Sequence, residues 1–329
     1  MRMTVPKVTV VIPNWNGLCH LPECLASLAA QSFADFETLI VDNASADGGI
    51  AWVRMQYPEV SVVELEHNGG FAKAVNTGIR ASDSQYIALL NNDTAVDRGW
   101  LQALVEALDH HKGYDSAASR IVMYSKPDLL NGAGDVWSRR GMTAVNRGYG
   151  EPASRYEVME RVFGACAGAA LYRRTLFDEV GLFDEGFFLM HEDTDFNLRC
   201  LIAGKRCLYV PHALVRHKLG ASIDTRPALN TVLLRMRNET YAAFKNLPAR
   251  TLWCRALAWP YRLLTHAVVA TAPRWSRLPF MLLCLALPSL GAEVAGLRLG
   301  LARRRDGWGR RALDTDEILG WLRRGSGPI

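Results

Sequence analysis

The feature that most constrains the fold is an alternation of short apolar runs and amphipathic stretches near the start of the chain. The apolar run Val8–Ile12 is followed by Leu21, Cys24, Leu25 and Leu28, whose spacing places one apolar face on a helix. The alternation continues, with strands predicted at 36–41, 60–65 and 86–90 and helices at 50–57, 71–79 and 101–108. Strand, helix and strand at this spacing form βαβ units, which require a parallel sheet. We therefore predict an α/β fold of the Rossmann-like kind, with a mostly parallel sheet flanked by helices.

The strand predicted at Tyr86–Leu90 ends abruptly in polar residues. Asn91, Asn92 and Asp93 follow it directly. In an open parallel sheet, ligands bind beyond the carboxyl ends of the strands, where the strand order reverses. A carboxylate there suits a hard divalent cation that is shared with a phosphate group. The same residues also fit a plain polar turn, because Asn and Asp favour turns.

Two other predicted strands end in polar turns. Residues 13–17 follow the first strand, and Asp42 ends the second. A third turn, residues 67–70, leads into a helix, whose N-terminus favours anions. We predict that these turns face the same ligand. Trp15 and Phe71, which lie in or beside them, are expected in the core rather than stacked on a base.

The middle of the chain has a less regular pattern. Residues 125–160 are rich in Gly, Arg and Pro, which fits either a mobile loop that closes over a ligand or an ordinary insertion. Residues 162–172 read as a strand whose small residues, among them Gly168, let a ligand approach the backbone. Residues 193–203 are predicted as a helix, and 211–222 as a loop that contains His217.

Cysteine content and targeting signals favour a cytoplasmic protein. The seven cysteines are odd in number and form no C-x-x-C pair, so neither a disulfide framework nor a zinc ribbon is expected. The first residues do not resemble a signal peptide. No uninterrupted apolar stretch reaches the roughly 18 residues of a spanning helix.

Charge divides the chain near residue 228. Residues 228–329 carry 16 Lys and Arg against 6 Asp and Glu, whereas the rest of the chain carries 22 against 27. The basic part also interleaves aromatic residues and arginines: Trp253, Trp259, Tyr261, Trp275 and Phe280 with Arg255, Arg262, Arg274, Arg277 and Arg298. We predict two domains, a catalytic one at 1–227 and a helical extension at 228–329. The extension either lies on the anionic cytoplasmic face of the inner membrane, or packs on the core or an oligomer partner.

Taken together, these segments resemble family 2 glycosyltransferases, and most closely the rhamnosyltransferase-like members that add a single sugar. The motifs that carry the resemblance follow one another across roughly residues 6–225: V-V-I-P-N-W-N-G, L-I-V-D-N-A-S, H-N-G-G-F-A-K-A-V-N-T-G, L-L-N-N-D-T, F-L-M-H-E-D-T-D-F-N-L-R and V-R-H-K-L-G-A-S. The resemblance implies a type A glycosyltransferase fold and inversion at the anomeric carbon.

The resemblance also implies roles for individual residues. Asp93 would bind Mg²⁺ or Mn²⁺ at the donor diphosphate, and His217 lies where some members supply a second metal ligand. Asp193 matches the catalytic base, and Glu192 beside it would orient the acceptor or the sugar. The candidate nucleotide-sugar-binding residues are Pro13, Asn14, Asn16, Asp42, Asn68, Gly70, Lys73, Asn92, Asp93, Gly168 and Arg237.

Other interpretations of the acidic residues stay open. Asp193 also fits a helix N-cap, and Glu192 also fits an ion pair with Arg199. Asn91 and Asn92 stand where other members carry Asp, which predicts modest metal affinity. Carboxylates crowded at residues 192–195 should raise at least one pKa and so make Asp193 a stronger base.

We therefore predict an enzyme that transfers one sugar to a hydroxyl of a lipid-linked or growing cell-surface glycan by metal-assisted direct displacement. dTDP-rhamnose is a candidate donor, and no nucleic-acid partner is expected. A dinucleotide oxidoreductase is disfavoured, because residues 13–17 replace the G-x-G-x-x-G that would follow its first strand. The alternative is a non-catalytic, membrane-recruited protein that binds a nucleotide-sugar, although Asp93 and Asp193 argue for catalysis.

Overall fold

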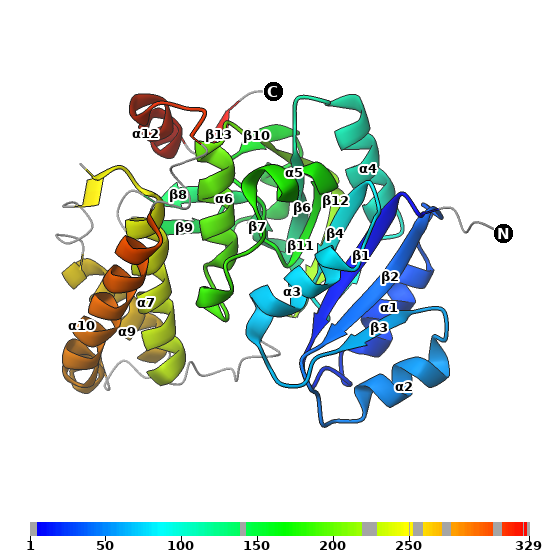
Figure 1. Cartoon of the computed structure of the whole chain (residues 1–329), viewed down its shortest axis with the longest axis horizontal. Helices are drawn as coiled ribbons and strands as arrows, with labels where there is room; N and C mark the ends of the chain where they lie inside the picture. The colour runs from blue at the N-terminus through cyan, green and yellow to red at the C-terminus, as the bar shows by residue number, and fades with distance from the viewer. Residues whose placement is uncertain are drawn as a thin grey trace.

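The computed structural model describes residues 5–138, 143–218, 229–249, 251–252, 259–271, 278–304, 311–324 and 326–327. In these residues a central sheet lies between helices, and a group of helices lies at the end of the molecule away from the first strands (Figure 1). This mixed α/β architecture with a helical C-terminal region confirms the predicted fold class.

The first part of the chain forms the parallel part of the sheet. Its strands are β1 (Val8–Asn14), β2 (Phe36–Asp42), β3 (Ser61–Glu64) and β4 (Tyr86–Leu90), in the spatial order β4-β1-β2-β3 with every neighbouring pair parallel. The helices between and after them are α1 (Leu21–Ala29), α2 (Gly49–Gln56), α3 (Gly70–Arg80) and α4 (Trp100–His110). All eight elements lie where the apolar periodicity predicted them.

The side chains of β1 alternate between two separate cores. Val10 and Ile12 pack in the cluster that contains the apolar faces of α1 and α4, whereas Val11 packs in the cluster that contains α3. Because successive residues of a strand point to opposite faces, a strand that is apolar throughout needs helices on both sides. The strand order reverses between β1 and β4, since the chain first moves outward through β2 and β3 and then returns.

Beyond β4 the sheet becomes mixed. The order continues through β11 (Ala169–Arg173), β6 (Ser116–Met123), β12 (Cys207–His217), β10 (Glu160–Val162) and β13 (Ser326–Gly327). β11 is antiparallel to both of its neighbours, whereas β6 and β12 are parallel. The short strand β5 (Thr94–Val96) pairs with β12, and β7 (Lys126–Ala133) pairs with β6.

Of the two interpretations of 125–160, the mobile loop is wrong, and the ordinary insertion stays a prediction. This segment contains β7, β8 (Asp135–Ser138), β9 (Thr143–Asn146), a short helix at 153–155 and the start of β10. The half of β7 that follows Leu129 is buried against β6, and the pairing of these two strands is irregular. The prediction that covered 139–142 lies outside the described residues.

Two other middle segments also differ from prediction. The strand predicted at 162–172 is two strands, β10 and β11, which pair with different neighbours and are separated by residues 163–168. Of the loop predicted at 211–222, the part up to His217 is instead the second half of β12, and residues 219–222 lie outside the described residues. The register of β12 on β6 shifts between Val210 and Leu214, which accommodates Pro211 within a sheet.

The next elements lead from the sheet to the C-terminal helices. They are α5 (Arg174–Val180), a short helix η2 (Glu185–Phe187) and α6 (Glu192–Ile202), which begins one residue before its predicted start. The C-terminal helices are α7 (Leu229–Asn246), α9 (Trp259–Thr271), α10 (Leu278–Ala302) and α12 (Thr315–Arg324).

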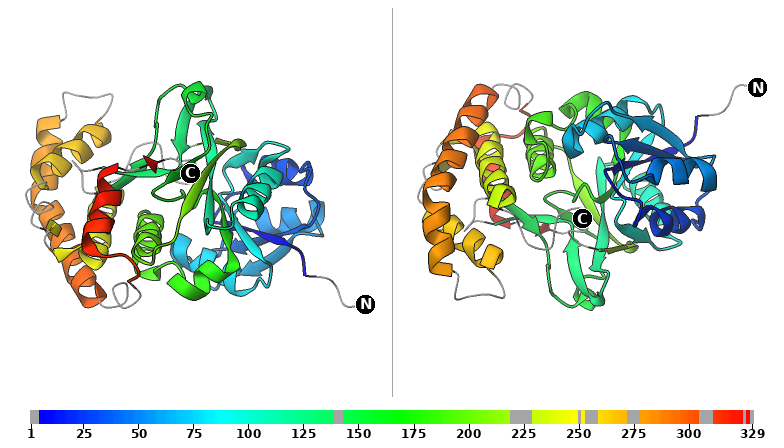
Figure 2. Two further views of the ribbon diagram at one scale, coloured as in Figure 1. Left: turned by 90° about the horizontal axis from the view of Figure 1, so that it is seen from above. Right: turned by 90° about the horizontal axis from the view of Figure 1, so that it is seen from below.

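The helices α7, α9 and α10 form a layer at one end of the molecule, with α6 between that layer and the sheet (Figures 1 and 2). α10 packs closely along α7, because Gly296 lies against the carbonyl oxygen of Arg237 and a Cβ there would be 2.3 Å from it. In the described part of the chain, no helix combines the length and the apolar character that crossing a membrane requires. Trp253, Arg255, Arg274, Trp275 and Arg277 of the predicted extension lie outside the described residues.

Candidate active site

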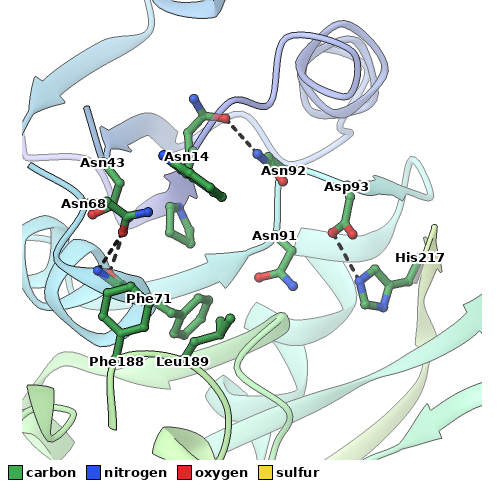
Figure 3. A pocket seen from close by; sticks show the side chains of 13 residues that line it. Asn14, Asn43, Asn68, Phe71, Asn91, Asn92, Asp93, Phe188, Leu189 and His217 are labelled. Atoms are coloured by element: carbon green, nitrogen blue, oxygen red, sulfur yellow. Dashed lines mark hydrogen bonds and ion pairs between the residues drawn. The ribbon is translucent and has the colours of Figure 1, made fainter. Parts of the chain in front are cut away.

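A cavity of about 340 Å³ lies at the carboxyl ends of β1 and β4, where the strand order reverses (Figure 3). It is lined by Pro13, Asn14, Trp15, Asn43, Asn68, Gly70, Phe71, Asn91, Asn92, Asp93, Phe188, Leu189 and His217. Seven of these were predicted from the sequence as ligand-binding residues: Pro13, Asn14, Asn68, Gly70, Asn92, Asp93 and His217. The structure therefore brings the polar ends of separate strands and turns into one site.

A chain of hydrogen bonds orients the amides on one side of the cavity. Asn14 donates from Nδ2 to Oδ1 of Asp42 at 2.7 Å and accepts at its Oδ1 from Nδ2 of Asn92 at 2.7 Å. Asp42 is buried and also accepts from the backbone and the hydroxyl of Ser45. Asp42 therefore does not line the cavity and instead fixes Asn14, which does. Asn16, also outside the lining, accepts at its Oδ1 from the backbone nitrogen of Ala46.

The opposite wall is formed by a close backbone contact. Gly70 has a φ of 83°, and a Cβ at this position would lie 2.2 Å from the carbonyl oxygen of Phe188. That oxygen accepts a hydrogen bond from the backbone nitrogen of Phe71 at 2.7 Å. Asn68 supports the turn by accepting from the backbone nitrogen of Gly70 at 2.9 Å. Glycine is required here both for the left-handed conformation and for the close approach.

Three other predicted ligand-binding residues lie outside the lining. Lys73 on α3 forms an ion pair with Glu185 at 3.5 Å. Gly168 accepts at its carbonyl oxygen from the backbone nitrogen of Asn91 at 2.8 Å, so it supports the cavity from behind. Arg237 on α7 donates to the carbonyl oxygen of Gly186 at 2.7 Å. Their predicted contacts with a donor stay predictions.

Asp93 and His217 form a pair at the edge of the cavity. Oδ1 of Asp93 lies 3.2 Å from Nε2 of His217 (Figure 3). Burial alone would raise the pKa of Asp93, but the hydrogen bond and charge of His217 lower it below its ordinary value. Nδ1 of His217 lies 2.9 Å from Oδ1 of Asn131, which can accept its proton and orient the ring. A carboxylate is a ligand that suits Mn²⁺ or Mg²⁺, whereas an imidazole suits transition-metal ions and so favours Mn²⁺ of the two. Within the described residues, no group of three or more His, Cys, Asp or Glu side chains could hold a metal.

α6 begins with Glu192, which is buried, and Asp193, which is half-buried. Burial first, and then the charge of Asp193, raises the pKa of Glu192 to about 8. Burial also raises the pKa of Asp193, against the lowering effect of backbone hydrogen bonds from Thr194 and Ala167. Ala167 is adjacent to Gly168, which holds the backbone of Asn91 in the cavity wall. Asp193 thus lies beside the segment that supports the cavity, although it does not line the cavity itself.

The N-cap and ion-pair interpretations of these two carboxylates are wrong. His191, with a φ of 67°, occupies the N-cap position of α6. Arg199 pairs through Nε with Asp195 at 2.8 Å, not with Glu192. Oε2 of Glu192 is buried and has no hydrogen-bond partner among the described residues.

Asp195 has the opposite electrostatic environment. It is fully buried and accepts from Lys245 at 2.9 Å and from Nδ2 of Asn246 at 2.7 Å, in addition to Arg199. Burial would raise its pKa, but the charges of Lys245 and Arg199 dominate and lower it to about 2. Asp195 is therefore a charged structural anchor. Of the three carboxyls in the first turn of α6, Glu192 and Asp193 therefore have raised pKa values and Asp195 a lowered one.

The prediction that Trp15 is a core residue is wrong, whereas Phe71 does pack against the core and also lines the cavity. Trp15 is 46% exposed and Phe71 is partly buried, and both line the cavity together with Phe188. Their rings follow the strand-end turns, where an aromatic face can contact a planar base. Their position directly beside polar strand-end turns was the signal that could have identified them.

Several residues of the site were not found from the sequence. Phe188 and Leu189 enter the cavity from the segment between η2 and α6. Asn131 and Asp135 belong to the region predicted as a loop, and burial together with the charge of Asp193 raises the pKa of Asp135 well above its ordinary value. The only sequence signal for Asn131 and Asp135 is the stretch N-G-A-G-D at 131–135, which begins and ends with these two polar residues.

The site combines a Rossmann-like sheet, a cavity where the strand order reverses, a carboxylate–histidine pair and a nearby carboxylate of raised pKa, an arrangement that suits an enzyme with a nucleotide ligand. Residues 9–181, more than half of the chain, match the model of glycosyl transferase family 2, and the chain belongs to that family. It is therefore a glycosyltransferase that uses a nucleotide-sugar.

The chain is similar to the N-acetylglucosaminyl-diphospho-decaprenol L-rhamnosyltransferase of Mycobacterium tuberculosis (strain ATCC 25618 / H37Rv). The two are 29% identical over 299 residues, which cover 82% of this chain and 94% of the relative. This similarity confirms the rhamnosyltransferase-like resemblance.

Two solved structures share the fold at low sequence identity. The mannosyltransferase PcManGT from Pyrobaculum calidifontis, in complex with GDP-Man and Mn²⁺, has a TM-score of 0.54 at 16% identity and covers 97% of this chain and 87% of its own. GalNAc-T7 with UDP, GalNAc and Mn²⁺ also has a TM-score of 0.54, at 17% identity. The match covers 73% of this chain and 51% of the GalNAc-T7 chain. Both likenesses support the type A glycosyltransferase fold.

Proposed function

We propose that the chain is an inverting glycosyltransferase that moves one sugar to a hydroxyl of a lipid-linked or growing cell-surface glycan. The observation that carries the proposal is the Asp93–His217 pair, which lies in the same cavity as the amide side chains of the strand ends. Rhamnose is the first sugar to test, because the Mycobacterium tuberculosis relative is named an L-rhamnosyltransferase. dTDP-rhamnose is accordingly our candidate donor.

The donor nucleotide would occupy the cavity between β1 and α3. Asn14, Asn43 and Asn68 offer amide donors and acceptors to a base and a ribose, and Asp42 keeps the amide of Asn14 oriented. Trp15 supplies an aromatic face at the rim of the same cavity. The diphosphate would then extend toward Asp93.

Asp93 and His217 are the residues that would hold a divalent ion, Mg²⁺ or Mn²⁺. Their donor atoms already face each other at 3.2 Å, and Asn131 fixes the imidazole from its other side. When bound, such an ion supplies Lewis-acid stabilisation of the charge on a departing diphosphate. The remaining ligands would be diphosphate oxygens, which agrees with a protein contribution of only two side chains in the described site.

Asp193 is the proposed general base. An acceptor hydroxyl would lose its proton to Asp193 while its oxygen attacks the anomeric carbon. The bond between that carbon and the diphosphate oxygen breaks in the same step, and its electron pair leaves with the diphosphate. One displacement of this kind inverts the anomeric centre. Glu192, with a pKa of about 8, keeps its proton at neutral pH and would donate a hydrogen bond rather than accept the proton.

The extension at 228–329 would bring the catalytic domain, residues 1–227, to the anionic cytoplasmic face of the inner membrane. Leu290, Val294 and Leu301 are exposed at helical spacing along α10, and Arg298 and Arg303 are exposed near them. Apolar residues bordered by arginines suit a helix that lies in the headgroup region. At such a surface a lipid-linked acceptor would be within reach of Asp193.

A non-catalytic nucleotide-sugar binder is the second candidate. It would need the same cavity, but it would have no use for a carboxyl of raised pKa beside that cavity. Turnover by the purified protein separates the two functions.

The test is transfer from dTDP-rhamnose, within a panel of nucleotide-sugars, to a lipid-linked saccharide with Mn²⁺ present. We expect release of the nucleoside diphosphate together with glycosylated product. Asp193→Asn, which is nearly isosteric, should bind donor normally and lose about 10²–10⁴-fold in turnover. Absence of transfer from every donor in the panel, with binding retained, would instead support the non-catalytic candidate. Near-normal turnover of Asp193→Asn would move the base to another carboxyl.

A further inference from the structure

The segment between the cavity and α6 has a strained backbone. Phe188 has φ 64° and ψ −62°, and the nitrogen of Leu189 donates to the carbonyl oxygen of Phe187 at 2.8 Å, which together form a γ-turn of the rare, strained kind. Met190 and His191 follow with φ values of 69° and 67°. Non-glycine residues persist in such conformations only where their surroundings hold them.

One end of this segment lines the cavity, and the other end begins the helix that carries Asp193. At one end, Phe188 and Leu189 line the cavity, and the carbonyl of Phe188 is bonded to the backbone of Phe71. At the other end, His191 is the N-cap of α6, two residues before Asp193. The conformation of 188–191 therefore sets the distance between the donor cavity and the proposed base.

A single side chain on α7 binds most of this segment. Nδ2 of Asn238 donates to the carbonyl oxygens of Phe187 at 2.9 Å, Leu189 at 2.9 Å and Met190 at 2.8 Å. Asn238 is fully buried, and its Oδ1 accepts from Nε of Arg237 at 2.8 Å. The amide is thus held in one orientation with its nitrogen toward the strained carbonyls.

The neighbours of Asn238 in sequence bind the same segment. Arg237 donates to the carbonyl oxygens of Gly186 and Phe187. Glu239 lies on the other side, with Oε1 3.6 Å from Nε2 of His191. Three consecutive residues of α7 therefore contact the chain between Gly186 and His191: Arg237 binds the two residues before the segment, and Asn238 and Glu239 contact the segment itself.

We propose that Asn238 is a positioning residue, which holds 188–191 in its strained conformation and thereby fixes Asp193 relative to the donor. This inference rests on the proposed function, because it assigns Asn238 to the same reaction. Asn238→Asp keeps the size of the side chain but turns an oxygen toward three carbonyl oxygens. The segment should then relax, and the base should move relative to the reacting carbon.

The experiment compares full-length wild type with Asn238→Asp, Asn238→Ala and the control Met236→Ala. Met236 is fully buried on the same helix but packs in the cluster that contains Leu263 of α9, so its replacement loosens α7 without removing bonds to the segment. Hydrogen–deuterium exchange of the peptide that covers 186–192 reports the conformation of the segment without any donor. Turnover and the Kd for dTDP-rhamnose with Mn²⁺ report its effect on the reaction.

Both Asn238 variants should exchange faster in 186–192 than the control does. Their turnover should fall by about 10²-fold, as expected for a misplaced catalytic group, while the Kd for donor changes little. Unchanged exchange in 186–192 would overturn the inference whether or not a donor has been identified. Faster exchange with a loss of turnover no larger than that of Met236→Ala would equally refute the positioning role. If wild type transfers no sugar, the proposed function fails, and the exchange result still decides whether Asn238 holds the segment.

Discussion

Glu192→Gln should stabilise the protein, and the gain should grow as pH rises. The side chain of Glu192 is 6% exposed, its Oε2 has no hydrogen-bond partner among the described residues, and Asp193 adds a like charge. The folded protein therefore disfavours the ionised form. Gln has nearly the same shape and cannot ionise, so it removes this cost and little else.

The sign and size of the effect follow from the two pKa values. The pKa rises from 4.5 to about 8 on folding, so the folded state keeps a proton that the unfolded state has lost. The contribution of Glu192 to stability is fully present below pH 4.5 and is lost as pH rises through about 8. One proton changes the free energy of unfolding by about 1.4 kcal/mol per pH unit, so a shift from 4.5 to about 8 limits the total to about 5 kcal/mol.

The assay is urea denaturation of wild type and variant between pH 5 and pH 9, in steps of about one unit, with the difference in unfolding free energy plotted against pH. We expect a rise across this range that levels off above pH 8. Glu66→Gln makes the same chemical change at an exposed carboxylate and is the matched control. A flat or falling difference for Glu192→Gln would show that the folded site does not disfavour the charged carboxylate, and our account of its burial would be refuted.

Two further predictions concern the Asp93–His217 pair and the extension at 228–329. Asp93→Asn should keep the fold but lose most sugar transfer, together with the part of the thermal stabilisation by dTDP-rhamnose that depends on Mn²⁺. If this variant kept wild-type turnover in excess chelator, the metal-binding role of Asp93 would be contradicted. Replacing both Leu290 and Val294 by Gln should weaken cosedimentation of the full chain with anionic vesicles at low salt. The control is Met55→Gln, which changes an exposed residue far from the extension. If wild type does not bind such vesicles, the extension has a packing role instead.

The parallel half of the fold was predictable because local and long-range preferences agree there. Val8–Ile12 and Tyr86–Leu90 are apolar throughout, as strands covered on both faces must be. The helices between them carry apolar residues at helical spacing, and the connections are short. Each element therefore has a signal that is independent of its neighbours.

The mixed half lacked such signals. β6 includes the run S-A-A-S, whose small residues have weak strand preference and become buried because β11 and β12 lie on either side. β12 contains Pro211, which normally indicates the end of a strand, but the shifted register between Val210 and Leu214 accommodates it. Both features depend on pairing partners that are far away in sequence.

The residues of the site divide in the same way into those that the sequence predicts and those that it does not. Strand-end residues such as Asn14 and Asp93 were predictable, because the carboxyl ends of neighbouring parallel strands meet at one edge. Phe188 and Leu189 line the same cavity, and Asn131 orients His217 at its edge, from segments whose paths depend on α7 and β6. No local pattern identifies a residue whose position is determined by a distant contact.

The three carboxylates of α6 show how a distant element decides a chemical role. Glu192, Asp193 and Asp195 are equivalent in the sequence, where each is an acidic residue in one helical turn. Lys245 and Asn246 of α7 bind Asp195, keep it charged and so exclude it as a base, whereas Asp193 forms no ion pair with a cation among the described residues. The same helix holds the segment before Asp193 through Asn238. A chain that ended at residue 227 would lose both effects, so we expect catalysis to require α7 even though the sheet and its cavity lie before it.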